Sequence, residues 1–207
     1  LYPELTEIGA KRTSKHLKGY GLENDNVEEA RYYTQEEVKD IVAFADRLGV
    51  EVIPEIDIPG HTTAILASLP ELSCKSEPVE VMIINGVSDG ILCAGNEKTF
   101  EFLDKLLGEI TALFPSKKFH IGGDEAFKGY KVWDECEKCK ALKEKLGLKE
   151  SKDLQIWFMN RVAEILKKYG KTAVAWDDCM GDALDKSIEC QLRRPNAIGK
   201  VRKLATE

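Results

Sequence analysis

The fold is indicated first by residues 118–125, which read KFHIGGDE. A short apolar strand at 118–121 is followed at once by two glycines and two adjacent acids, Asp124 and Glu125. Neighbours on a regular strand point to opposite faces, so these acids can share a pocket only if the backbone leaves strand geometry. The glycines permit this, because glycine adopts left-handed conformations without steric cost. The stretch therefore predicts a strand that ends in an acidic pocket.

The same order of elements continues on both sides of this strand. Amphipathic helices are predicted at 34–48, 96–113 and 152–169 and from about 196, and strands at 50–53, 172–176 and 188–192. Thr34 and Glu37 form a capping box at the first of these helices. The region from Thr62 to Gly95 is predicted to be an inserted loop.

This alternation predicts an α/β fold with a parallel sheet and helical crossovers. In a (β/α)₈ barrel the active site lies at the carboxyl ends of the strands, where this chain places its polar residues. Four strands would be half of such a barrel, and a doubly wound sheet fits the periodicity equally well. No G-x-G-x-x-G motif follows a strand, so a dinucleotide site has no support.

The composition excludes several classes of protein. The chain has 207 residues, 43% of them hydrophobic, which argues against disorder. With 30 Lys+Arg against 36 Asp+Glu its formal net charge is −6, which argues against nucleic-acid binding. No apolar run approaches the ~18–20 residues of a membrane span. The first residue is Leu1 and no signal-peptide pattern follows, so we expect a processed or partial chain.

Six cysteines are present, but only Cys136 and Cys139 are close together in sequence. A structural zinc site normally needs a second pair of ligands at metal spacing, and no such pair is visible. We therefore expect two cysteines on one face of a helix and no metal.

Three predicted strand ends collect the residues that could perform chemistry: Asp57 with His61, Asp124 with Glu125, and Trp176 with Asp177 and Asp178. Two carboxyl groups forced together acquire separated pKa values, so that one stays ionised while the other keeps a proton to donate. Simpler interpretations remain open. The acidic pair could be a turn with a helix cap, and Asp57 could form an Asx-turn. His61 could be a hydrogen-bonded loop residue, and Trp176 could be part of the core.

Two motifs together resemble the family 20 glycoside hydrolases, the β-N-acetylhexosaminidases. They are VIPEIDIPGH at 52–61 and FHIGGDE at 119–125, and YYTQEE at 32–37, YGK at 169–171 and AWDD at 175–178 extend the likeness. The resemblance covers residues 1–207 and implies one partial catalytic (β/α)₈ barrel domain with about strands three to six. Groups that the family places on strands one, two, seven and eight have no counterpart, and Leu192 stands where an aromatic residue is usual.

The resemblance implies retaining exo-hydrolysis of terminal β-linked GlcNAc or GalNAc, an exception to the two-carboxylate scheme. Glu125 would be the general acid/base, and Asp124 would orient the 2-acetamido group, whose carbonyl oxygen is the nucleophile. His61 would tune Glu125, Asp57 would support the polar network, and Trp176 would form a wall of the acetamido pocket. No metal or cofactor is implied. The partner would be a glycan that contains N-acetylhexosamine. The family resemblance suggests an extracellular, periplasmic or lysosomal location. It assigns no oligomeric state.

Two other functions stay open. The chain could be a catalytically incompetent carbohydrate-binding fragment of such an enzyme, because half of the pocket has no counterpart. It could also be a metal-dependent hydrolase that uses Asp57, His61, His120 and Asp124, although these residues lack an established ligand spacing. By default we expect His120 to be a buried residue that packs or hydrogen-bonds behind the site.

Overall fold

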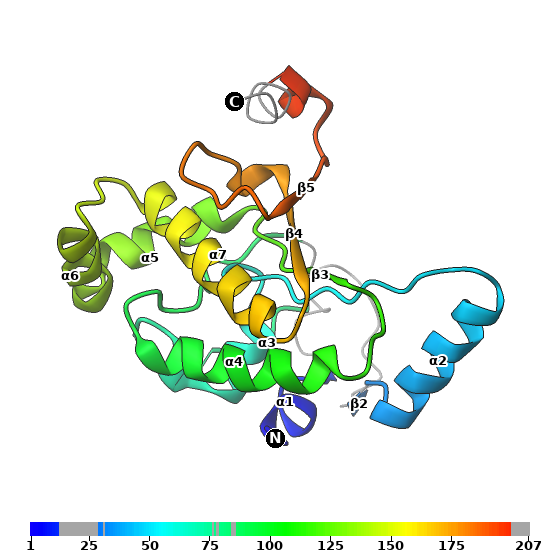
Figure 1. Cartoon of the computed structure of the whole chain (residues 1–207). Helices are drawn as coiled ribbons and strands as arrows, with labels where there is room; N and C mark the ends of the chain where they lie inside the picture. The colour runs from blue at the N-terminus through cyan, green and yellow to red at the C-terminus, as the bar shows by residue number, and fades with distance from the viewer. Residues whose placement is uncertain (13–28, 31, 76, 78, 84–85, 200–207) are drawn as a thin grey trace.

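The computed structural model of the protein describes residues 1–12, 29–30, 32–75, 77, 79–83 and 86–199 (Figure 1). Its helices are α1 (Glu4–Glu7), α2 (Gln35–Arg47), α3 (Thr63–Ser68), α4 (Glu97–Thr111), α5 (Tyr130–Glu135), α6 (Glu137–Leu146) and α7 (Ser151–Lys168). Its strands are β1 (Lys11–Arg12), β2 (Glu29–Ala30), β3 (Lys118–His120), β4 (Thr172–Trp176) and β5 (Glu189–Gln191). Single turns of 3-10 helix are η2 (Pro70–Leu72), η3 (Ala126–Gly129), η4 (Asp177–Cys179) and η5 (Pro195–Ala197).

A parallel sheet in the order β3-β4-β5 forms the centre of the fold. Phe119 of β3 lies opposite Ala173 of β4, and Ala175 lies opposite Cys190 of β5. Parallel neighbours need a crossover connection, and α7 supplies the one that leads into β4. The predicted α/β class with a parallel sheet is therefore confirmed, and the strands at 118–121, 172–176 and 188–192 are present with small changes at their ends.

The helices α4 and α7 provide much of the core beside this sheet. Asn96 caps the first turn of α4 with its side chain, as its position before the apolar stripe predicts. Leu103 and Leu107 of α4 and Phe158 and Val162 of α7 are fully buried. The two helices lie side by side, and α7 packs against β4 (Figure 1). The strand ends that carry the acidic residues therefore stand on a rigid base.

The predicted helix at 34–48 is confirmed as α2, but its apolar stripe is not buried. Thr34 Oγ1 accepts a hydrogen bond from the Glu37 N–H at 3.2 Å, and the Thr34 N–H donates to the Glu37 carboxylate at 2.7 Å. Ile41 and Phe44 are nevertheless 44% and 57% exposed, and α2 stands apart from the other helices (Figure 1). Local capping thus defines the helix, while the described part of the chain covers its apolar face only in part, leaving Val38, Val42 and Ala45 half-buried.

The strand predicted to start at 50–53 and to end within 54–61 pairs with β3 only from Pro54 onward, so its start at 50–53 needs correction. The His120 N–H donates to the Pro54 carbonyl at 2.9 Å, and the Ile56 N–H donates back to the His120 carbonyl at 3.0 Å. The Ile58 N–H then reaches the Ile121 carbonyl at 3.2 Å. A strand needs a neighbour, and β3 is a neighbour to the residues around Asp57 rather than to the apolar run before them. This pairing places Asp57 beside the end of β3.

Two further expectations need correction or fall at the edge of the structure. The predicted loop at 62–95 contains α3 and η2. The predicted helix from 196 begins with η5, and its remainder at 200–207 lies outside the described residues. Over the ranges that the structure describes, no helix has the length and apolar character needed to cross a membrane.

Candidate active site

The backbone breaks away from strand geometry directly after β3, as the glycine pair predicts. Gly122 and Gly123 have φ angles of +67° and +97°. A Cβ atom at Gly122 would lie 1.8 Å from Asp57 Oδ1, and one at Gly123 would lie 2.9 Å from Met159 Cε. Only glycine satisfies both the left-handed backbone and the close approach, so the turn requires these two residues.

Hydrogen bonds from the surrounding elements hold this turn in place. The Gly122 N–H donates to His120 Nδ1 at 3.0 Å, and the Gly123 N–H donates to Asp57 Oδ1 at 3.1 Å. The Gly123 carbonyl accepts from the Gln155 amide at 2.7 Å, and Gln155 is buried in α7. The sequence interpretation missed Gln155, because a glutamine in a buried helical stripe has no local signature.

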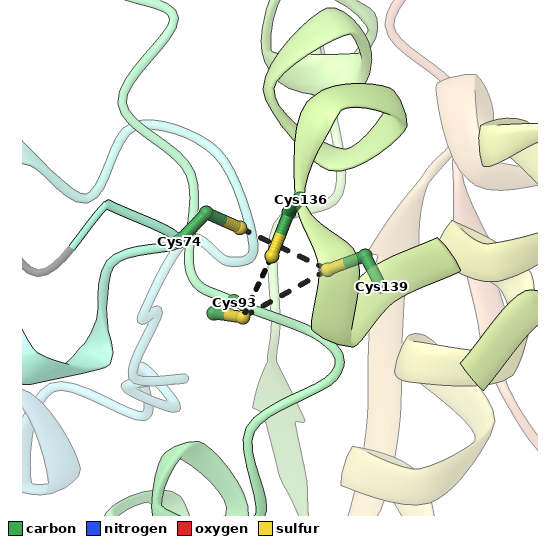
Figure 2. Close-up of side chains that lie close together, drawn as sticks. All are labelled: Cys74, Cys93, Cys136 and Cys139. Carbon is green, nitrogen blue, oxygen red and sulfur yellow. Dashed lines mark hydrogen bonds between the residues drawn. The ribbon is translucent and has the colours of Figure 1, made fainter. Parts of the chain in front are cut away.

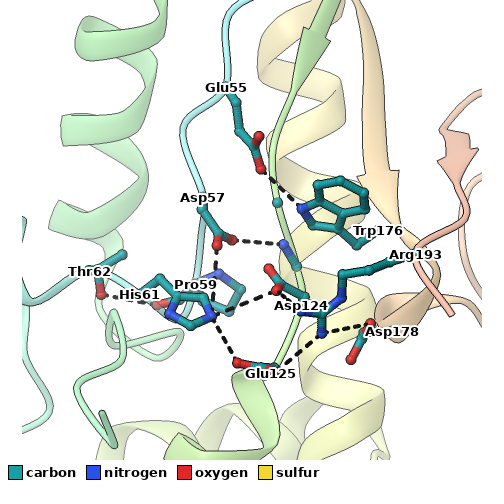
Figure 3. A network of polar contacts seen from close by, with 12 residues as sticks. Glu55, Asp57, Pro59, His61, Thr62, Asp124, Glu125, Trp176, Asp178 and Arg193 are labelled. Carbon is teal, nitrogen blue, oxygen red and sulfur yellow. Dashed lines mark hydrogen bonds and ion pairs between the residues drawn. The ribbon is translucent and has the colours of Figure 1, made fainter. Parts of the chain in front are cut away.

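The turn brings the two adjacent acids to one place (Figure 3). His61 Nε2 lies 3.5 Å from Glu125 Oε2, 3.8 Å from Asp124 Oδ2 and 3.9 Å from Asp57 Oδ2. The Asp124 side chain is 10% exposed and the Glu125 side chain 25%. His61 and Glu125 have φ angles of +54° and +52°, so backbone strain at both residues aims their side chains at the cluster. The geometry that the sequence predicts for these four residues is present, and their roles stay predictions.

Asp124 presents an unpaired acceptor within this cluster. Its Oδ1 atom is buried and has no hydrogen-bond partner among the described residues. An unpaired buried acceptor is costly, typically about 1–3 kcal/mol, and a ligand N–H or O–H would satisfy it. This atom is therefore a recognition point for a hydrogen-bond donor.

Arg193 ties the acids together from the opposite side, and the sequence interpretation missed it. Its Nη1 lies 3.0 Å from Asp124 Oδ2, and its Nη2 lies 3.3 Å from Glu125 Oε1 and 3.5 Å from Asp178 Oδ2 (Figure 3). Its backbone N–H donates to the buried Asp177 Oδ1 at 2.6 Å, which fixes the chain after β5. The signal was available, because Arg193 follows a strand end as the other site residues do.

Burial and the neighbouring carboxylate of Asp124 raise the pKa of Asp57 to about 8. Burial is the larger cause, and the repulsion between the two carboxyl groups acts in the same direction. Asp57 therefore keeps a proton near neutral pH. This is the separation of two carboxyl groups that their proximity predicts.

Trp176 ends β4 at the same edge of the sheet (Figure 3). Its indole Nε1 donates to Glu55 Oε1 at 3.0 Å, and its ring lies 4.7 Å from the ring of His120. His120 is buried, as expected, and burial lowers its pKa. Glu55, which the sequence interpretation did not single out, fixes the orientation of the tryptophan. The indole is therefore held between Glu55 and His120, and its role as a wall of the pocket stays a prediction.

Among the described residues, two groups of side chains have the spacing of metal ligands. Asp57, His61 and Asp124 form one group, and His120, which only the metal-dependent alternative included, is not part of it. Four cysteines form the other, and here the expectation of an isolated helical pair is wrong. Cys136 lies between α5 and α6, and Cys74 and Cys93 supply the second pair from distant segments.

Comparison with known proteins matches residues 1–200 to the model of glycosyl hydrolase family 20, catalytic domain. A β-hexosaminidase of Porphyromonas gingivalis is 38% identical over 186 residues, which are 90% of this chain and 22% of that protein. The crystal structure of a β-N-acetylhexosaminidase from Bacteroides fragilis has a TM-score of 0.77 at 37% identity and covers 99% of this chain and 37% of its own.

A second solved structure was determined with a sugar bound. It is the family 20 exo-β-N-acetylglucosaminidase from Vibrio harveyi in complex with N-acetylglucosamine, with a TM-score of 0.78 and 32% identity. The match covers 98% of this chain and 32% of that one. The chain thus spans between about a fifth and two fifths of the relatives it matches.

Proposed function

We propose, from the premise that this chain belongs to glycosyl hydrolase family 20, that it carries the catalytic centre of a retaining exo-β-N-acetylhexosaminidase. The substrate is a glycan with a terminal β-linked GlcNAc or GalNAc. The three parallel strands and the paired segment at 54–58 would be consecutive strands of a (β/α)₈ barrel, about the third to the sixth. The polar ends of these strands would then form part of the pocket at the carboxyl edge of the barrel.

One observation carries the proposal: a buried, unpaired oxygen of Asp124 lies beside a partly exposed Glu125. An N-acetylhexosamine offers an amide N–H that this oxygen can accept. That hydrogen bond would hold the acetamido group so that its carbonyl oxygen faces the anomeric carbon. Because the nucleophile belongs to the substrate, the enzyme needs no second carboxylate at a fixed distance for attack.

The reaction has two steps. In the first, the acetamido oxygen bonds to the anomeric carbon while the glycosidic bond breaks, and Glu125 gives its proton to the departing oxygen. The product of this step is an oxazolinium ion, whose positive charge Asp124 stabilises. In the second, water attacks the anomeric carbon, Glu125 takes a proton from it, and the ring opens to restore the acetamido group. Two inversions give overall retention.

The neighbouring residues position these two acids. His61 contacts Glu125 at 3.5 Å and would tune its proton transfer. Asp57 would support the network through its contacts with His61 at 3.9 Å and with the Gly123 N–H of the glycine turn at 3.1 Å. Trp176 offers an aromatic face on which the acetamido methyl group could pack.

The test is hydrolysis of aryl β-N-acetylglucosaminides by the protein and by its Glu125→Gln and Asp124→Asn variants. We expect each variant to lose about 10²–10⁴-fold in kcat. Glu125→Gln should lose more activity on substrates with poor leaving groups than on an activated aryl glycoside, because only a poor leaving group needs the proton. Glu135→Gln, an exposed acid on α5 that pairs with Lys131, is the matched control and should keep full activity.

Unchanged activity in Glu125→Gln would contradict the role of that residue. Calorimetric binding of N-acetylglucosamine without any turnover would contradict the catalytic proposal and support a carbohydrate-binding function. Loss of activity on chelation, together with loss of an ion from Asp57, His61 and Asp124, would support the metal-dependent alternative.

A further inference from the structure

Four cysteine side chains meet beside the start of α6, and none of them belongs to the acidic cluster (Figure 2). They are Cys74, Cys93, Cys136 and Cys139, and their sulfur atoms all lie within 4.8 Å of one another. Cys93 and Cys139 are buried, and Cys74 and Cys136 are partly buried. Cys74 and Cys93 come from the segment between α3 and α4, while Cys136 and Cys139 come from the start of α6. Three separate parts of the chain thus converge on one point.

The separations of the sulfur atoms match the edges of a tetrahedron around a metal ion. The distance is 3.8 Å for Cys74–Cys139, 3.8 Å for Cys93–Cys139 and 3.9 Å for Cys93–Cys136. A zinc ion bound at about 2.3 Å by four thiolates requires sulfur–sulfur edges of about 3.8 Å. A disulfide requires about 2.05 Å and pairs the cysteines two by two. The observed arrangement shares each buried sulfur among several neighbours instead.

The backbone around the cluster favours thiolates. Cys136 is the N-cap of α6 and Cys139 lies in its first turn, so both sulfur atoms lie near the positive end of a ten-residue helix. A Cβ atom at Gly95 would lie 2.3 Å from the Lys138 carbonyl carbon, so the loop approaches the helix as closely as only glycine allows.

We propose that these four cysteines bind one zinc ion as a closed structural site. Zinc binding would replace the four thiol protons, which are released to solvent, and would leave no open position for water or substrate. The site would therefore contribute to stability rather than to the hydrolysis. It is independent of the proposed function, because none of its ligands contacts the acidic cluster in the described residues.

The bound ion would fasten the segment that lies behind the active site. Next to Cys93, the Leu92 N–H donates to the Pro59 carbonyl at 3.0 Å, and the Leu92 carbonyl accepts from Trp133 Nε1 at 2.9 Å. Pro59 leads directly to His61. Cys93 itself accepts, through its carbonyl, a hydrogen bond from Thr99 of α4 at 2.9 Å. Zinc would thus join this segment to α6 and hold the loop that presents the histidine.

The first test is the metal content of the protein purified without chelators or added metal. We expect one zinc per chain by elemental analysis, and X-ray absorption should show four sulfur neighbours at about 2.3 Å. Reduced, metal-free protein should take up one equivalent of zinc, and Co²⁺ in its place should give the charge-transfer absorption of a tetrahedral thiolate site. Failure of the reduced protein to bind zinc at micromolar concentration overturns the proposal.

The matched variants are Cys93→Ser within the cluster and Cys190→Ser, a partly buried cysteine outside it. Cys93→Ser should lose the bound zinc and lower the melting temperature, whereas Cys190→Ser should keep the zinc. If Cys93→Ser fails to fold, removal of zinc from the unaltered protein must produce the same fall in melting temperature. A disulfide between any two cluster cysteines in protein isolated without reductant, detected by peptide mass spectrometry, overturns the proposal. Failure of the glycosidase assay alone would leave this result unaffected.

Discussion

Asp57 Oδ2 and Asp124 Oδ2 lie 3.9 Å and 3.8 Å from the same atom, His61 Nε2, and burial together with the Asp124 charge raises the pKa of Asp57 to about 8. Asp57 at the same time accepts the Gly123 N–H at 3.1 Å. One side chain therefore supports both the glycine turn and the residue proposed to orient the substrate. Its protonation state links the stability of the fold to the state of the site.

Stability should fall as pH rises through the range in which Asp57 holds its proton only in the folded state. The pKa of Asp57 is raised from 3.8 to about 8, so between about pH 4 and about pH 8 the folded chain binds a proton that the unfolded chain has released. Across this range the free energy of unfolding should fall by up to about 1.4 kcal/mol per pH unit, and above the folded pKa it should fall no further. Asp57→Asn keeps the acceptor and donor, so it should flatten the slope. Urea unfolding of both proteins across this pH range gives the slope of the unfolding free energy against pH. Equal slopes in the two proteins would contradict the assignment.

Replacement of Gly122 should damage the site far more than backbone strain alone explains. Gly122 and Gly170 have nearly equal φ angles of +67° and +68°, but a Cβ atom meets Asp57 at the first and nothing within 4 Å at the second. Gly170→Ala should cost about 1–2 kcal/mol, the penalty of a left-handed alanine. Gly122→Ala should cost clearly more and abolish hydrolysis. Thermal unfolding and kcat of both variants provide the comparison, and similar losses in the two would show that the close approach is unimportant.

Arg193 should support catalysis through its ion pairs with Asp124 and Glu125. Arg193→Met removes charge-assisted hydrogen bonds that typically contribute about 1.5–3 kcal/mol, so kcat/KM should fall roughly 10- to 100-fold. Arg194→Met is the control, because Arg194 pairs with Asp178 and with neither proposed catalytic acid. We expect Arg193→Lys to recover part of the loss. Equal effects of Arg193→Met and Arg194→Met on kcat/KM would mean that the guanidinium does not position the acids.

Glu55 should influence sugar binding through Trp176. Glu55→Ala removes the acceptor of the indole N–H, so the tryptophan loses its fixed orientation and KM should rise severalfold with a smaller change in kcat. Glu55→Gln keeps an acceptor at the same position and should restore binding. Inhibition by N-acetylglucosamine, measured for both variants, checks the expectation. An unchanged inhibition constant in Glu55→Ala would show that the orientation of Trp176 does not affect sugar binding.

Features that depend on adjacent residues could be predicted from the sequence. The capping box of Thr34 and Glu37 and the extent of β4 follow from local propensity and periodicity. The turn after β3 follows from its two glycines, and it brings Asp124 and Glu125 together. Each of these signals lies within a few residues of the structure it specifies.

Features that depend on distant partners could not be predicted in this way. The apolar run at 50–53 has strand propensity but no neighbouring strand in the described residues, so pairing shifts to Pro54. Gly108, which costs about 1 kcal/mol in a helix relative to alanine, lets the Tyr169 hydroxyl approach to 2.7 Å from the position that a Cβ atom would occupy. The cysteine cluster is likewise invisible in sequence, because its ligands are brought together only by tertiary contacts.

The left-handed backbone at Glu125 implies a conflict between durability and chemistry. A non-glycine residue at φ +52° stores about 1–2 kcal/mol that a glycine would release. Selection of random variants for heat resistance alone should therefore enrich glycine at this position, and the proposed role of Glu125 predicts that these variants are inactive. A directed-evolution experiment on this protein would need to select for turnover in every round.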